Sequence, residues 1–178
     1  MRHGDLDTLE VDALLLPMFS GREQPRGAAG CLDWRLCGGL ARMIRCGDFS
    51  GGENEVSLLS YRARIRPARV FLVGLGHRGP RSALRCHRDV ERMVDVLMDA
   101  QVESVALGPP RPGVDGLLPG WLSAPAWSRT LFGRLVLLDT DGHVESCRDA
   151  LGRSVDVSTI DLEPRGVGSP LVGPEGEA

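Results

Sequence analysis

The residues best placed to do chemistry lie in the glycine-rich segment 74–79, GLGHRG. This segment follows a short apolar run, precedes a helical pattern, and so occupies the position where α/β folds commonly bind ligands. Gly74 and Gly76 have no side chains, so the backbone amides there can approach a phosphate. His77 and Arg78, which follow directly, would complete such a site. The spacing differs from GxGxxG, so the motif alone is weak. Binding of a phosphate or nucleotide here is one hypothesis; a plain strand-to-helix turn is the other.

Other reactive groups do not form a recognisable catalytic or metal-binding pattern. All 21 basic residues are arginine, which leaves no lysine for a Schiff base, a phosphate loop or general-base chemistry. His77, Cys86 and His87 are the densest group of metal-ligating atoms, but Cys86 lies on a helix's apolar stripe and His87 about 100° around it. No serine lies in a GxSxG elbow. The sequence therefore predicts a protein that is not an enzyme and has no cofactor or metal.

Two groups of residues suggest contact with another protein. Alternating arginines after residue 61 place Arg62 and Arg64 on one face of a strand, where the alternative is a solvated basic face. Trp121 and Trp127 stand in a Pro-rich apolar segment, and tryptophan is enriched in binding hot spots. The alternative for both tryptophans is that they fold back over the sheet as a lid on the core.

Composition limits the class of partner and the location. The chain has 178 residues, a formal net charge of −3 and a pI of about 5.8, so it lacks the overall positive charge typical of a nucleic-acid-binding domain. No apolar run approaches the ~18 residues needed to span a membrane, and the N-terminus has no signal-peptide pattern. We expect a cytoplasmic protein that contacts proteins, including copies of itself, and neither nucleic acid nor membrane.

Hydrophobic patterning predicts an α/β domain with alternating elements. The run at 13–19 is apolar throughout, which is typical of a central strand covered on both faces. Apolar residues recur every fourth position over 31–45 and predict one amphipathic helix, ended by Gly47. Further elements are predicted as strands at 56–61, 69–74, 102–107 and 135–139, and helices at 82–100 and 144–151. The order strand, helix, strand from Val70 onward implies a parallel crossover.

The secondary structure of the C-terminal part of the chain is harder to predict from the sequence. Residues 108–125 are rich in glycine and proline, so regular structure is expected to break there. Residues 163–178 again combine glycine and proline without periodicity, which predicts a mobile tail. The expected organisation is a single domain over 1–162 followed by this tail.

Several segments, taken in order, resemble the N-terminal domain of the leucyl aminopeptidase family. They are DALLLPMF at 12–19, Leu32-Asp33 opening a helix, GDFSG at 47–51, and VFLVGLG at 70–76. That family's domain has a buried strand, a helix ending in a GDF-G turn, a hairpin-like pair and a VLLVGLG strand in this order. The resemblance covers about residues 5–107.

The resemblance implies a macro-domain-like fold, with a mixed β-sheet flanked by helices. It also implies that this chain lacks the family's two-metal peptidase centre, which lies in a separate C-terminal domain with lysines and an NTDAEGR-type segment. In full-length family members this domain helps to organise assembly. The leading hypothesis is therefore a non-catalytic protein-interaction or scaffold module. The alternative is a macro-domain-like module that binds ADP-ribose or a nucleotide around Gly74 to Arg78.

Overall fold

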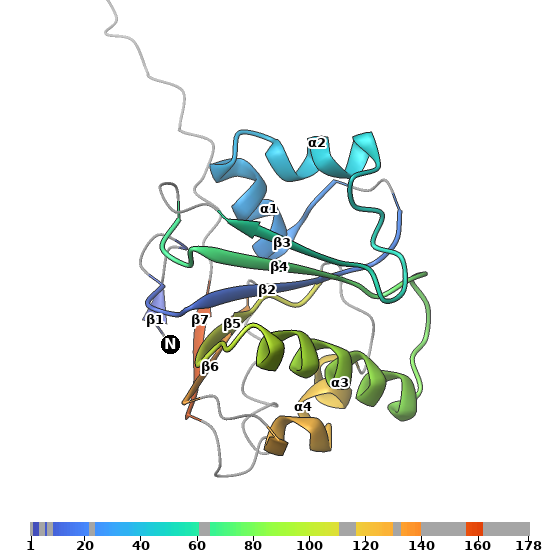
Figure 1. Cartoon of the computed structure of the whole chain (residues 1–178), viewed down its shortest axis with the longest axis vertical. Helices are drawn as coiled ribbons and strands as arrows, with labels where there is room; N and C mark the ends of the chain where they lie inside the picture. The colour runs from blue at the N-terminus through green and yellow to red at the C-terminus, as the bar shows by residue number, and fades with distance from the viewer. Residues whose placement is uncertain are drawn as a thin grey trace, which may run out of the picture.

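A seven-stranded mixed sheet forms the centre of the protein, as the computed structural model shows (Figure 1). The structure describes residues 2–3, 6, 9–21, 24–60, 65–110, 117–129, 133–139 and 156–161. The strands, in their order across the sheet, are β1 (Arg2–His3), β7 (Asp156–Asp161), β6 (Arg134–Asp139), β5 (Ser104–Leu107), β2 (Ala13–Met18), β4 (Arg69–Gly74) and β3 (Val56–Ser60). Each neighbouring pair is parallel except β3 and β4, which are antiparallel.

Strand β2 lies between β5 and β4, which confirms the prediction of a central strand. Its apolar run has no polar face because the side chains enter two cores in alternation. Ala13 and Leu15 pack on one side of the sheet, and Leu14 and Leu16 on the other. The predicted parallel direction of β4 and β5 is also confirmed, with β2 between them.

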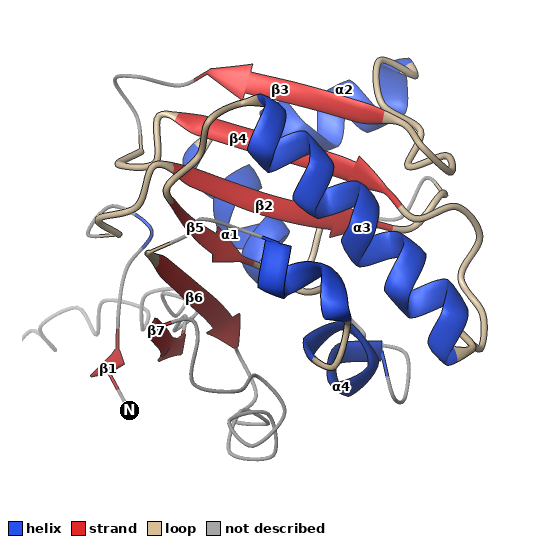
Figure 2. Cartoon of the chain, turned by 60° about the horizontal axis from the view of Figure 1, so that its bottom comes forward, coloured by secondary structure: helices blue, strands red, loops and turns tan. Residues whose placement is uncertain are grey.

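Helices cover both faces of this sheet (Figure 2). The helices α1 (Gly27–Arg35) and α2 (Gly39–Cys46) cover one face, packing with Leu14 and Leu16. The other face carries α3 (Ala83–Asp99), α4 (Leu117–Leu122) and a 3-10 helix at Pro125–Arg129. No helix in the described part of the chain is long and apolar enough to cross a membrane.

The predicted single helix over 31–45 is wrong, because the structure has two helices there. Cys37 and Gly38 adopt positive φ angles of 53° and 79°, which end α1 and redirect the chain. Asp33 stabilises the new start, since its Oδ1 accepts a hydrogen bond from the Ala41 amide at 2.8 Å in the first turn of α2. Gly47 ends α2 at a φ of 85°, as predicted.

The segment 108–125 is more regular than its composition suggests, since it contains α4. Strand β7 was not predicted from the sequence, and it pairs with β6 over six residues. The predicted helix at 144–151 and the predicted tail at 163–178 both lie outside the described residues.

Candidate functional site

A small cavity lies at the carboxyl ends of β2 and β5, where the glycine-rich segment predicts a ligand site. Its volume is about 70 Å³, and its walls include Met18, Phe19, Phe49, Gly108 and Arg78. Pockets for drug-sized ligands usually measure about 300–1,000 Å³. In this structure the cavity is therefore far too small for a nucleotide.

The glycines of the predicted phosphate site are used to pack backbone against backbone. The Gly74 amide donates to the Glu55 carbonyl at 2.8 Å, and the Gly76 amide donates to the Gly51 carbonyl at 2.9 Å. A Cβ at Gly74 would collide with the Gly52 carbonyl, which explains the need for glycine there. These two amides are therefore not available to a phosphate.

His77 and Arg78 are both exposed beyond the end of β4. His77 Nδ1 lies 3.4 Å from the Ser20 hydroxyl, and the Arg78 guanidinium lies over the Phe19 ring at 5.1 Å. Of the four predicted ligand-binding residues, Arg78 alone lines the cavity. Among the residues that the structure describes, no three His, Cys, Asp or Glu side chains are grouped in a way that would hold a metal ion.

The Glu55 carboxylate lies in a ring of donors beside this cavity. The amides of Ser50 and Gly52 donate to it at 3.0 to 3.1 Å, and the Ser50 hydroxyl donates at 2.7 Å. Burial tends to raise the pKa of Glu55, but these hydrogen bonds outweigh it and hold the pKa below its usual value. An anionic glutamate thus fixes the 50–55 loop against the end of β4.

A buried ion pair joins the loop after β4 to α3 and α4. Arg81 Nη1 lies 2.9 and 3.0 Å from the two Asp89 oxygens, with both side chains at most 10% exposed. Arg81 Nη2 also donates to the Leu75 carbonyl, and Trp121 Nε1 donates to Asp89 at 3.3 Å. Burial raises the pKa of Asp89, although the Arg81 charge and the Trp121 hydrogen bond oppose the rise. This network holds three segments of the chain together.

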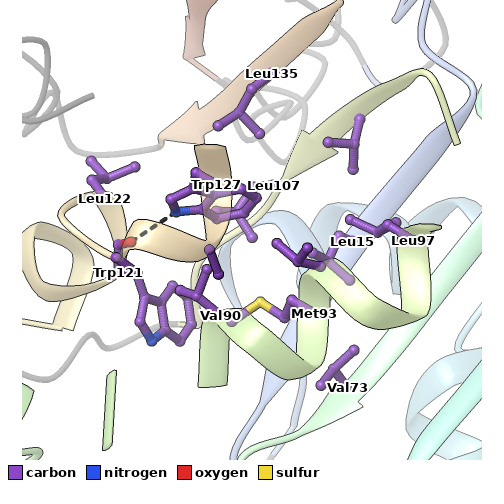
Figure 3. Packing of buried hydrophobic residues seen from close by; sticks show 14 of the residues in the cluster. Leu15, Val73, Val90, Met93, Leu97, Leu107, Trp121, Leu122, Trp127 and Leu135 are labelled. Carbon is purple, nitrogen blue, oxygen red and sulfur yellow. Dashed lines mark hydrogen bonds between the residues drawn. The ribbon is translucent and has the colours of Figure 1, made fainter. Parts of the chain in front are cut away.

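Trp121 and Trp127, which the sequence offers as docking residues, lie in the core at 0% and 5% exposure (Figure 3). Both pack against the inner side of α3, around Val90 and Met93. Trp127 Nε1 donates to the Trp121 carbonyl at 2.8 Å. As placed here they match the alternative interpretation, a lid on the core, and offer no exposed ring to a partner. Arg62 and Arg64 lie outside the described residues.

The third tryptophan, Trp34, was not predicted as a site residue, and its side chain is 66% exposed at the end of α1. An open depression beside it is lined by residues of α1 and of the turn before α2, and we call this the Trp34 surface: Gly30, Asp33, Trp34, Arg35, Cys37 and Gly38. The Arg35 guanidinium lies 5.9 Å from the centre of the Trp34 ring. One signal was present in the sequence, because Trp34 falls outside the apolar stripe of Leu32, Leu36 and Leu40.

Known proteins resemble this chain in sequence and in fold. Residues 15–116 match the sequence model of the cytosol aminopeptidase family, N-terminal domain. A probable cytosol aminopeptidase of Solibacter usitatus is 30% identical over 102 residues, which are 57% of this chain and 19% of that protein. The chain thus spans about a fifth of the length of this curated relative.

Two solved structures of macrodomains share the fold. The macrodomain of Trypanosoma brucei aligns with a TM-score of 0.54 at 15% identity, over 92% of this chain and 61% of that one. A mutant macrodomain of Oceanobacillus iheyensis gives 0.50 at 11% identity, over 90% and 81%. At such identities the likeness concerns the fold alone, and it confirms the predicted macro-domain-like α/β architecture. Since the family match spans more than half of the residues, this chain belongs to the cytosol aminopeptidase family, through that family's N-terminal domain.

Proposed function

We propose that this chain is a non-catalytic, cytoplasmic protein-interaction module that docks on a partner protein through the Trp34 surface. The observation that carries the proposal is the 66% exposure of Trp34. Tryptophan is usually well buried, and an exposed one beside a depression is a frequent anchor in protein interfaces. The side chains of Trp121 and Trp127 are buried in the core. Trp34 is therefore the one tryptophan of the three whose ring is accessible to a partner.

The charge of this helical layer indicates the chemistry of the partner. Residues 24–47 carry Arg26, Arg35, Arg42 and Arg45 but a single acid, Asp33, in a chain whose net charge is −3. The Asp33 carboxylate already accepts the Ala41 amide. In the described part of the protein Arg42 and Arg45 are exposed, and neither forms an ion pair. An acidic protein segment with an apolar side chain fits such a surface.

Binding of ADP-ribose or a nucleotide at the carboxyl ends of the strands is the second candidate. Its support is the position of the cavity and the presence of Arg78 in its wall. Against it stand the volume of about 70 Å³ and the engagement of the Gly74 and Gly76 amides. A rise in Tm on adding ADP-ribose would revive this candidate, and we expect no rise.

The proposed docking role is tested by comparing the proteins that two variants capture from a cell extract. Trp34→Ala removes the anchor, whereas Leu84→Ala removes an equally exposed apolar side chain, 62% exposed, from α3 on the opposite face of the sheet. We expect at least one acidic protein that the wild type and Leu84→Ala retain and Trp34→Ala loses. Its retention should also fall with added salt, because surface charges are screened. Identical sets of bound proteins for both variants would rule out the Trp34 surface.

A further inference from the structure

Strand β3 ends the sheet, and its outer edge is not paired with any other described strand. Figure 2 shows β3 as the outermost strand, with α3 crossing its neighbours on one face and α2 behind it. A free edge presents unpaired amides and carbonyls, which are ready to pair with another strand.

The register with β4 identifies the backbone groups that face outward. The Gly74 amide donates to the Glu55 carbonyl, so residue 55 and every second residue after it, Ser57 and Leu59, direct their backbone groups toward β4. The amides and carbonyls of Val56, Leu58 and Ser60 therefore point away from the sheet. Leu58 is the middle one of these three residues, with Val56 and Ser60 two positions away on either side.

This edge lacks the usual protection against pairing. Natural edge strands carry charged residues, proline or a bulge, whereas β3 reads VSLLS and has no charge and no proline. Leu58 lies opposite the core residue Phe71, on the face of the sheet that carries α3, yet its side chain is 55% exposed. Leu59 points the other way and packs with the α1 and α2 core. One side of the strand is thus anchored while the exposed leucine has no cover from the described residues.

We propose that the β3 edge is a self-association site, occupied by β3 of a second copy of this chain in antiparallel pairing. With the two-fold axis at Leu58, Val56 pairs with the partner's Ser60, Leu58 with the partner's Leu58, and Ser60 with the partner's Val56. Each pair exchanges both hydrogen bonds, which uses every outward group of the strand. The two exposed leucines then lie side by side and cover each other.

The position of Leu58 favours antiparallel pairing with a second copy. Leu58 is the middle one of the three residues whose backbone groups point outward, so a two-fold axis at this residue pairs all the outward groups of both strands. The inference rests on the proposed interaction role, but it uses a surface other than that of Trp34, so each surface is tested by its own variant.

Light scattering after size exclusion, over concentrations up to about 1 mM, measures the association directly. We expect the wild-type mass to rise with concentration from 19.2 kDa toward twice that value. Leu58→Lys should remain a monomer, since two lysines would meet at the axis. Leu84→Lys, which adds the same charge at a leucine 62% exposed on α3, and Trp34→Ala should both associate like the wild type.

Mixing two charge variants tests whether residue 58 meets its own copy. Leu58→Lys and Leu58→Glu are each expected to be monomeric alone and to form a heterodimer when combined. A wild type that stays at 19.2 kDa throughout, a Leu58→Lys protein that still associates, or a mixture that does not, would each overturn the proposal. Thermal unfolding of each variant shows that it is folded, as expected for changes at exposed positions.

Discussion

Replacing Asp89 by asparagine removes the negative charge of the buried ion pair while keeping the shape of the side chain and an acceptor for Trp121. Arg81 then keeps its full charge at 3% exposure with the Leu75 carbonyl as its remaining strong acceptor among the described residues. Removing one partner of a buried pair usually costs about 3–5 kcal/mol, because the other charge is left uncompensated. The asparagine oxygen still accepts hydrogen bonds, so we expect about 3 kcal/mol for Asp89→Asn.

Urea unfolding at pH 7 measures this loss, with the double variant Arg81→Met/Asp89→Asn as the key comparison. For a chain of this length about 3 kcal/mol corresponds to a Tm lower by roughly 6–12 °C. The double variant has no buried charge at this place and retains the Trp121 acceptor, so it should be more stable than Asp89→Asn alone. An Asp89→Asn protein within about 1 kcal/mol of the wild-type stability would contradict this expectation, and so would an Arg81→Met change that only adds to the loss.

Three further changes test other parts of the structure. Trp121→Ala should lower the free energy of unfolding by about 3–5 kcal/mol, whereas Trp34→Ala should alter it by less than about 0.5 kcal/mol; similar losses would contradict the assigned burial. Asp33→Ala should cost about 1 kcal/mol by removing the acceptor at the start of α2, measured by urea unfolding. Glu55→Gln should be less stable than the wild type at pH 7, since the lowered pKa of Glu55 means that folding favours its anion. That difference should shrink as the pH falls below about 4.3, the ordinary glutamate value, and a constant difference would count against the hydrogen-bonded carboxylate.

The parts of the fold that the sequence predicts are those with a strong local signal. The uninterrupted apolar run of β2 is typical of a strand covered on both faces, and the long stripe of α3 has one periodicity throughout. The break between α1 and α2 was missed because the apolar spacing continues across it. The pair Gly38-Gly39 was the available sign of a positive φ in that stretch. Strand β7, DVSTID, has four polar residues among its six, so its sequence lacks a strong strand signal, and the strand is defined by its pairing with β6.

The candidate site was harder to predict, because its chemistry depends on contacts between distant residues. A glycine-rich turn after a strand offers free amides in the sequence, yet Gly74 and Gly76 donate theirs to the 51–55 loop. Trp121 and Trp127 stand in a Pro-rich stretch that suggests a surface loop, but α4 and the 3-10 helix after it pack against α3 and bury both. Trp34 shows the reverse, because the sequence places it outside the apolar stripe, whereas its 66% exposure is evident only from the structure.

Site-specific photo-crosslinking tests the docking role most directly. A photoreactive phenylalanine analogue is placed at position 37, an exposed residue of the Trp34 surface, in one sample and at position 84, the exposed α3 leucine, in another, so that Trp34 itself is kept. Both samples are irradiated in cell extract. We expect a discrete crosslinked product from position 37 that contains an acidic protein and weakens with added salt. Position 84 should give none. Equal products from both positions, or none from position 37, would contradict a docking role for the Trp34 surface.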